Sequence, residues 1–301
     1  MPGHHRQDVH LDARSILRAK GRTFALAARL LPADTAADAT LLYAFCRHVD
    51  DLADSPTAGP SARSELVNLR EQIFSGSGKL PLVREFLQMA NRRGLSSVSA
   101  MKLIDGAISD LEDTVLIQNV EQLIEYCYLV AGTVGEMMCP ILGGTPELLP
   151  QAADLGIAMQ MTNIARDIRE DALMGRQYIP ANWIPTLSVD QLSSHSEQTQ
   201  SELTRAVQRL LRMAESRYTK ARSGLACLPM KNRLGISVAA DVYREIGRCI
   251  EQRGYEVRRQ RTVVPPHRKL VRTMRTLARC LWTPLGRKVN GECSISGVVH
   301  E

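Results

Sequence analysis

The sequence has no apolar run long enough to cross a membrane as a helix. No stretch of the 301 residues approaches the roughly 20 consecutive apolar residues that such a helix requires. The N-terminal residues MPGHHRQDVHLDAR have no apolar centre and lack the pattern of a secretory signal peptide. We therefore expect a cytoplasmic protein.

Other common patterns are missing too. The seven cysteines are scattered without a CxxC pair, which argues against a disulfide framework and a zinc site, so reduced thiols are expected. No GxGxxG fingerprint is present, and Gly76-Ser77-Gly78-Lys79 lacks the spacing and the final Ser/Thr of a P-loop. We therefore expect no reducing cofactor such as NADPH.

Alternating strand patterns are nearly absent, and apolar residues recur with helical spacing instead. The Pro/Gly/Ser-rich stretches between these segments are too short for domain linkers. We predict an all-α protein with a single domain over residues 1–301 and a core over about 12–283, and we expect 1–11 and 288–301 to be disordered. The predicted helices cover 12–30, 35–55, 62–74, 81–93, 97–115, 120–140, 147–173, 200–226, 232–253 and 267–283.

The positive charge is concentrated near the C-terminus. The net charge is +6, yet ten Lys/Arg stand against one acidic residue between Tyr255 and Asn290. On a helix over 267–283, one face would be apolar and the opposite face basic. Such a helix can lie on an anionic membrane. The alternative is a last helix packed on the core with a solvated basic face. The apolar residues are Leu270, Val271, Met274, Leu277, Ala278, Leu281 and Trp282, and the basic ones are Arg268, Lys269, Arg272, Arg275 and Arg279.

Nucleic acid is not an expected partner, because no recognisable reader motif accompanies this charge. The sequence does not give the oligomeric state.

Acidic residues form two rows at helical spacing. In LLYAFCRHVDDLAD, Asp50 and Asp54 are four apart and Asp51 and Asp54 are three apart, so one helix face would carry all three carboxylates. We call this the first acidic row. The second acidic row is Asn163, Asp167 and Asp171, again four apart. Like charges at this spacing destabilise an isolated helix by about 0.2–0.5 kcal/mol per pair. Folding alone therefore gives no reason to place them within apolar sequence.

Carboxylate and amide oxygens without His or Cys suit hard cations, chiefly Mg²⁺ or Mn²⁺. Mg²⁺ usually takes only one or two protein carboxylates and completes its shell with phosphate oxygens. Two such rows with arginines nearby suggest a diphosphate bridged by several ions, which would leave more readily. The carbocation left by an allylic diphosphate would need an apolar cavity that excludes water. The alternative is a pair of solvated acidic faces.

These residues resemble the squalene/phytoene synthase family. Residues 126–135, YCYLVAGTVG, resemble the family's YCYxVAGxVG helix, and residues 175–180, GRQYIP, resemble its GRxYLP turn. Residues 242–247, VYREIG, match a late-helix signature, and the match runs from about residue 14 to 270 in the expected order. The amino-acid sequence from Asp154 to Ile184 is most similar to those of bacterial phytoene synthases.

The resemblance implies a helical bundle of the isoprenoid synthase type with a central cavity. It implies a head-to-head condensation of two geranylgeranyl diphosphates through prephytoene diphosphate to phytoene. The expected absence of a reducing cofactor favours phytoene over squalene. Rival readings are a dehydrosqualene, hydroxysqualene or squalene synthase acting on farnesyl diphosphate, a terpene cyclase, and a non-catalytic helical assembly factor.

The resemblance also assigns roles. Asp50, Asp54, Asn163, Asp167 and Asp171 would hold the metal-bridged diphosphate with support from Asp51, and Arg47, Arg166 and Arg261 would contact phosphate. Tyr126 and Tyr243 would hydrogen-bond the departing diphosphate. Gln160, Val130, Ala131 and Gly135 would line the substrate site. Residues 20–24 match a family flap that usually carries serines, but Gly21 and Thr23 stand here, so the hydroxyl at 21 is lost. The alternatives are core tyrosines, a structural Arg166 and glycines that permit close packing.

The sequence also suggests how the length of the substrate's prenyl tail is selected. Thr40, Arg47 and Asp54 are seven apart, so Thr40 lies on the same helix face as the first acidic row. Ala28, Ala37 and Thr40 are small, and we hypothesise that they leave a pocket deep enough for a twenty-carbon tail.

Overall fold

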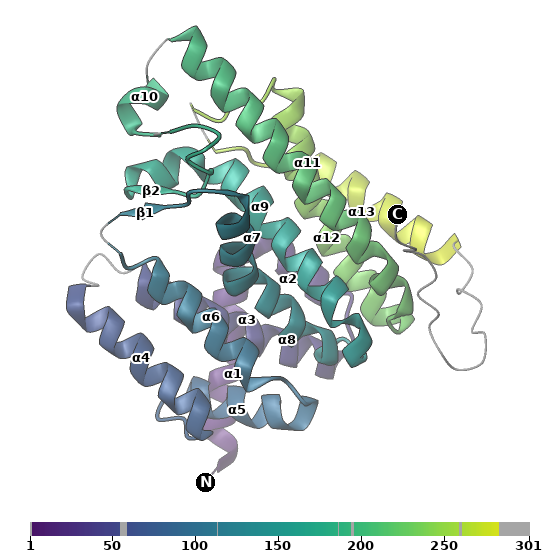
Figure 1. Ribbon diagram of the computed structural model, residues 1–301. Coiled ribbons are helices and arrows are strands. Elements are labelled where there is room, and N and C mark those ends of the chain that lie inside the picture. The colour runs from purple at the N-terminus through teal and green to yellow at the C-terminus, as the bar shows by residue number, and fades with distance from the viewer. Residues whose placement is uncertain are drawn as a thin grey trace.

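The computed structural model describes residues 2–54, 59–112, 114–185, 187–193, 196–258 and 261–282. Helices form almost all of this part of the chain and pack side by side (Figure 1). The all-α prediction is confirmed. The helices are α1 Pro2–Lys20, α2 Arg22–Ala28, α3 Ala33–Ala53, α4 Gly59–Ser75, α5 Pro81–Arg93, α6 Ser97–Ser109, α7 Val120–Cys127, α8 Thr133–Ile141, α9 Leu149–Leu173, α10 Val189–Ser193, α11 Glu197–Cys227, α12 Met230–Gln252 and α13 Pro266–Trp282.

Several predicted boundaries differ from those of the structure. The helix expected over 12–30 is two helices, α1 and α2, separated by Gly21. A Cβ at Gly21 would lie 2.8 Å from the phenol of Tyr43, so a larger residue here would require the end of the Tyr43 side chain to move. The chain is already helical from Pro2, where disorder was expected, whereas 288–301 lies outside the described residues. The helix expected over 120–140 contains a π-helical segment, η1 Tyr128–Gly132, between α7 and α8.

A short parallel strand pair joins two distant segments. β1 Val115–Leu116 pairs with β2 Arg176–Gln177, with Val115 opposite Arg176. The pair brings the residues after α6 next to those after α9 (Figure 1). The strand pair thereby fixes the position of Arg176.

Helix α9 is the centre of the packing and contacts α8, η1, α11 and α12. Its approach to η1 and α8 is very close. A Cβ at Gly156 would lie 2.1 Å from the carbonyl oxygen of Ala131, and one at Gly135 would lie 2.1 Å from that of Ala152. Two backbones therefore meet where other residues carry side chains, which confirms the packing role considered for Gly135.

The buried apolar residues form two main clusters. One contains residues of α9, α11 and α12, and the other contains residues of α3, α4, α5 and α6. The two acidic rows thus lie on helices of different clusters, α3 and α9. Any space between the clusters can be bounded by both rows.

Two further findings concern membrane-spanning helices and cysteines. Among the described residues, none of the helices combines the length and the apolar content needed to cross a bilayer. The side chains of Cys46, Cys127, Cys139, Cys249 and Cys280 are free thiols, in agreement with the expectation of reduced cysteines at these positions.

Candidate active site

A cavity of about 750 Å³ lies between the two clusters. Residues of α2, α3, η1, α8, α9 and α12 line it, together with residues 261–264. Its size is within the range of ordinary ligand pockets, and most of its wall is apolar. Fourteen of the predicted site residues line the cavity: Gly21, Thr23, Ala28, Thr40, Arg47, Asp50, Val130, Ala131, Gly135, Gln160, Asn163, Arg166, Tyr243 and Arg261.

Helix α3 contributes Arg47 and Asp50 to the cavity wall. Asp51 is instead half-exposed and accepts hydrogen bonds from Lys20 Nζ at 2.8 Å and Arg47 Nε at 2.7 Å. This triplet ties α1 to α3. Asp51 therefore holds two cations at the rim rather than facing the cavity itself.

Helix α9 contributes Gln160, Asn163 and Arg166. The Asn163 amide nitrogen donates to Gln160 Oε1 at 3.2 Å, which turns the amide oxygen away. That oxygen, Asn163 Oδ1, is buried without a hydrogen-bond partner among the described residues. A buried oxygen in that state is costly unless a ligand satisfies it.

Asp167 is held by two guanidinium groups. Arg166 Nε and Arg261 Nε each donate to Asp167 Oδ1 at 2.7 Å. Burial raises the pKa of the Tyr243 hydroxyl, and the positive charge of Arg166 opposes that rise. These charge-assisted contacts place two cations and one hydroxyl at the same end of the cavity.

Asp110, which belongs to neither acidic row, is the acceptor for two tyrosines and lies beside Arg176. Its carboxylate accepts from Tyr126 at 2.9 Å and Tyr178 at 2.8 Å. Arg176 donates to Asp54 Oδ1 at 2.9 Å and to the Asp110 carbonyl oxygen at 3.2 Å. Tyr126, predicted to touch diphosphate, thus contacts Asp110 and is not among the cavity-lining residues.

Sequence reasoning assigned no site role to Asp110, Arg176 or Tyr178. The last two belong to the GRQYIP turn, so that motif was the signal that could have found them. Asp110 carries no local signal, because its neighbours come from β2 and α7.

The electrostatics follow from reduced hydration, although the Asp50 side chain is exposed to the open cavity and Asp171 and Asp110 are half-buried. Loss of hydration raises the pKa of Asp50 to about 7, although Arg47 acts against the rise. Burial, followed by repulsion from Asp167, raises the pKa of Asp171 to about 8. Burial also raises the pKa of Asp110, and its hydrogen bond from Tyr178 opposes that shift. Loss of hydration is thus the main cause at all three carboxyls, of which only Asp50 lines the cavity.

These features fit a divalent cation that is shared with a phosphate ligand. Within the described ranges, no three His, Cys, Asp or Glu side chains are grouped closely enough to hold a metal by themselves. The unpartnered Asn163 oxygen and the poorly hydrated carboxyls of Asp50 and Asp171 are oxygen donors of the kind that Mg²⁺ takes. Mg²⁺ usually keeps several positions for water and phosphate oxygens, so sparse protein ligands are expected.

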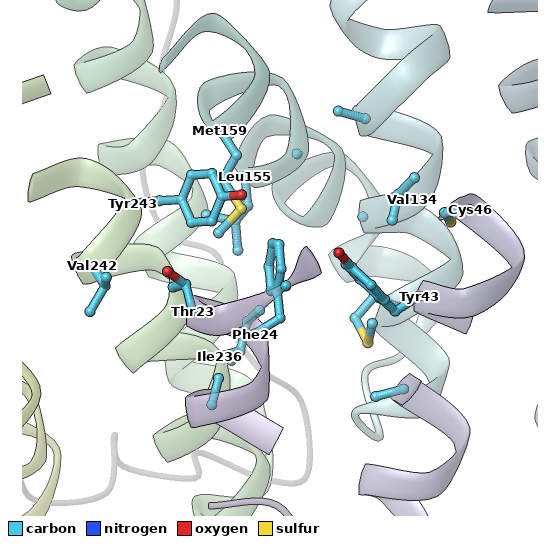
Figure 2. Close-up of a pocket in the computed structure, with 18 of the residues that line it drawn as sticks. Thr23, Phe24, Tyr43, Cys46, Val134, Leu155, Met159, Ile236, Val242 and Tyr243 are labelled. Atoms are coloured by element: carbon cyan, nitrogen blue, oxygen red, sulfur yellow. The ribbon is translucent and has the colours of Figure 1, made fainter. Parts of the chain in front are cut away.

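Aromatic side chains stand beside this polar end. Figure 2 shows Phe24, Tyr43 and Tyr243 pointing into the same space, and the Phe24 ring centroid lies 5.9 Å from that of Tyr43 and 5.2 Å from that of Tyr243. Burial raises the pKa of Tyr43 to about 12. Sequence reasoning missed Tyr43, although it precedes Arg47 by four residues and Asp50 by seven and so shares their helix face.

Away from the acids, the wall is apolar. Ala28 and Thr40 line this part as predicted, whereas Ala37 does not. The Thr40 hydroxyl donates to the Ala36 carbonyl at 2.6 Å, so it is already satisfied and needs no partner in the cavity. Small residues at these positions leave the cavity its volume.

Comparisons with known proteins agree with this description. The squalene/phytoene synthase family model matches residues 17–268. The chain is 35% identical over 259 residues to the 15-cis-phytoene synthase of Pantoea ananas, covering 81% of this chain and 84% of that protein. It is 35% identical over 269 residues to the 15-cis-phytoene synthase of a Paracoccus species, covering 84% and 86%.

The fold is also that of solved structures. A dehydrosqualene synthase in complex with ligand superposes with a TM-score of 0.80 at 25% identity, covering 93% of this chain and 99% of that one. The squalene synthase HpnC from Alicyclobacillus acidocaldarius superposes with a TM-score of 0.71 at 22% identity, covering 85% and 97%. The predicted isoprenoid synthase type of bundle is confirmed. The chain therefore belongs to the squalene/phytoene synthase family.

Proposed function

We propose that this protein joins two geranylgeranyl diphosphates head to head, through prephytoene diphosphate, to give phytoene for carotenoid biosynthesis. The observation that carries the proposal is one apolar cavity whose wall includes Arg47 and Asp50 of α3 and Asn163 and Arg166 of α9. The phytoene synthase names of relatives at about 35% identity over most of the chain support it.

We propose Mg²⁺ as the cofactor, with Mn²⁺ as a substitute, and no NADPH. When bound, the cation would neutralise developing charge on the leaving diphosphate. Asp50, Asp54, Asn163, Asp167 and Asp171 would hold it together with the substrate.

Side chains of the protein would bind phosphate, donate a hydrogen bond to the leaving group and stabilise the carbocation. Arg47, Arg166 and Arg261 would bind phosphate oxygens in competition with the carboxylates that they contact now. The Tyr243 hydroxyl would donate to the departing diphosphate. The rings of Phe24, Tyr43 and Tyr243 would face the allylic carbocation, since aromatic faces attract cations, and the apolar wall would exclude water from it.

The test is product analysis with the purified full-length chain. Geranylgeranyl diphosphate and Mg²⁺ alone are expected to give phytoene and diphosphate, and excess EDTA is expected to stop the reaction until Mg²⁺ is restored. Parallel reactions with farnesyl diphosphate, with and without NADPH, measure the rival activity. Conversion of farnesyl diphosphate only, or undiminished turnover after chelation, would contradict the proposal.

Chain-length selection gives a second prediction. Replacing Ala28 by Phe is expected to lower kcat/KM for geranylgeranyl diphosphate by at least about tenfold, because the ring would fill cavity volume that a long tail needs. Ala37→Phe is the matched control, since Ala37 is a partly exposed alanine of α3 outside the cavity wall. Steady-state kinetics with both prenyl diphosphates checks this. Equal effects of the two substitutions would rule out a depth limit at Ala28.

Finally, we propose that the chain binds peripherally to the cytoplasmic face of a membrane.

A further inference from the structure

Helix α13 carries its apolar face on the outside. Leu270, Met274 and Trp282 are 63%, 60% and 88% exposed, and Val271 beside them is also exposed. Residues 270, 274, 278 and 282 are spaced by four and lie on one side of the helix, which we call the outer face of α13. A surface helix ordinarily buries its apolar face and exposes its polar one. Here the usual arrangement is reversed.

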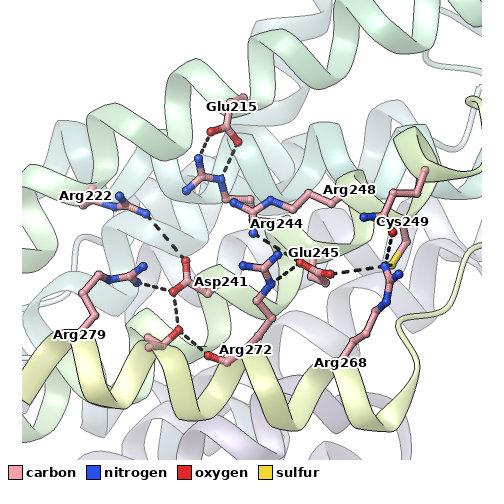
Figure 3. Close-up of polar contacts among 12 residues, drawn as sticks. Glu215, Arg222, Asp241, Arg244, Glu245, Arg248, Cys249, Arg268, Arg272 and Arg279 are labelled. Carbon is pink, nitrogen blue, oxygen red and sulfur yellow. Dashed lines mark hydrogen bonds and ion pairs between the residues drawn. The ribbon is translucent and has the colours of Figure 1, made fainter.

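The reversal is fixed by polar contacts on the inner side. Thr273, Thr276 and Cys280 are buried there. The Thr276 hydroxyl donates to Asp241 Oδ2 at 2.5 Å, and Arg272 Nε lies 2.5 Å from Glu245 Oε2. Figure 3 shows these two acids of α12 facing the arginines of α13.

Glu245 is only 3% exposed, so turning its partners outward would leave a buried charge without compensation. Of the two interpretations drawn from the sequence, a helix with a solvated basic face is therefore wrong for Arg272, which is directed inward.

The flanks of the outer face are positively charged. Arg275 is exposed, and Arg279 is half-exposed although it pairs with Asp241. Together with the excess of basic residues in this segment, these groups favour a negatively charged partner. A second copy of the chain meeting this face about a two-fold axis would set the same cations against each other. An anionic lipid bilayer offers both a negative surface and an apolar interior for Leu270, Met274 and Trp282.

The cavity opens beside this helix. Val263 lines the cavity and is also 62% exposed, so it lies at an opening. Lys269, in the first turn of α13, lines the cavity as well. This observation bears on the partner through the proposed function: a hydrocarbon product released next to α13 would enter a lipid phase rather than water.

We propose that the outer face of α13 docks the protein on an anionic bilayer, with the opening at Val263 and Lys269 placed at the lipid surface. Leu270, Met274 and Trp282 enter the interfacial region, and Arg275 contacts lipid phosphate. Asp241 and Glu245 hold the helix in the orientation that makes this contact.

The test is co-sedimentation of the full-length protein with vesicles of phosphatidylcholine alone or mixed with phosphatidylglycerol. Binding is expected only to the mixed vesicles, and raised salt is expected to weaken it. Met274→Glu is expected to lower the partition coefficient between vesicles and water at least about tenfold. An apolar side chain that would enter the bilayer is then replaced by a charge that anionic lipid repels. Phe74→Glu on α4 is the matched control, since Phe74 is a 78% exposed apolar residue on another helix.

Trp282 supplies a direct signal. Its emission is expected to shift to shorter wavelength with the mixed vesicles, and the shift is expected to vanish in Trp282→Phe. Equal loss in Phe74→Glu and Met274→Glu, or no binding to either vesicle, would overturn the proposal. So would a dimer that Met274→Glu abolishes, measured by ultracentrifugation without lipid.

Vesicle binding needs no substrate, so its failure is distinct from failure of the proposed reaction. Phytoene formation in detergent is expected to be unchanged in Met274→Glu. If binding fails while that reaction proceeds, only the docking surface is wrong.

Discussion

Replacing Asp50 or Asp171 by asparagine is expected to lower the rate of phytoene formation by about 10²–10³-fold, the scale of losing one group that stabilises developing charge. The same substitutions are expected to make the metal-free protein more stable at pH 8. Asp50 is exposed to the open cavity and Asp171 is half-buried, yet the protein atoms around both carboxyls reduce their hydration and raise the pKa of Asp50 to about 7 and that of Asp171 to about 8. Function and stability should therefore move in opposite directions at these two positions.

The sign follows from proton linkage. In the unfolded chain an aspartate has a pKa of about 3.9, so between that pH and the folded value the folded protein binds more protons than the unfolded one. The free energy of unfolding of the metal-free protein then falls as pH rises from about 4 to about 8. Asparagine is neutral throughout and removes this penalty.

Thermal melts in EDTA at pH 5 and pH 8 provide the measurement. Asp34→Asn, on the helix that carries Asp50, is the control, because hydrogen bonding to the Thr35 backbone lowers the pKa of this exposed carboxyl, so its loss is not expected to stabilise the protein at pH 8. A lower melting temperature of Asp50→Asn and Asp171→Asn at pH 8, or turnover close to that of the parent, would contradict the account.

Arg176→Met is expected to destabilise the protein by about 2–3 kcal/mol and to reduce turnover as well. Arg176 is the cation between Asp54 and the Asp110 segment, and its removal leaves acids at the end of the cavity without compensation. The expected loss is below that of a fully buried pair, because the Asp54 side chain is 44% exposed and water screens it.

Urea unfolding of Arg176→Met beside Arg63→Met separates this effect from that of an ordinary ion pair. Arg63 pairs with Glu112 at 2.7 Å with both side chains well exposed, so its replacement should change stability by less than about 1 kcal/mol. Adding Asp54→Asn to Arg176→Met is expected to restore part of the loss. If the two single arginine variants unfold alike, Arg176 has no special role in balancing the acids.

Local spacing was enough to find the two acidic rows. Helical periodicity places Asp50 near Arg47 and Asn163 near Gln160 without knowledge of the fold, and the structure puts all four on the cavity wall. The fold class followed from the same periodicity. What these features share is that they depend on a single helix.

Features that depend on several segments were not predictable in that way. Asp110 receives hydrogen bonds from Tyr126 on α7 and Tyr178 after β2, and nothing in the sequence near Asp110 indicates this convergence. The break at Gly21 depends on Tyr43, which lies on another helix. The orientation of α13 depends on Glu245, whose ion pairs override the ordinary rule that apolar faces turn inward.

The contact between Gly156 and the Ala131 carbonyl, with its counterpart between Gly135 and Ala152, limits how this enzyme could be redesigned. Even one added methyl group on either glycine would collide with peptide backbone, which cannot rotate aside as a side chain can. Libraries that aim to alter product size should therefore leave this wall untouched and diversify the facing one, around Ala28 and Thr40. Natural variants that make products of other lengths would be expected to differ on that side of the cavity as well.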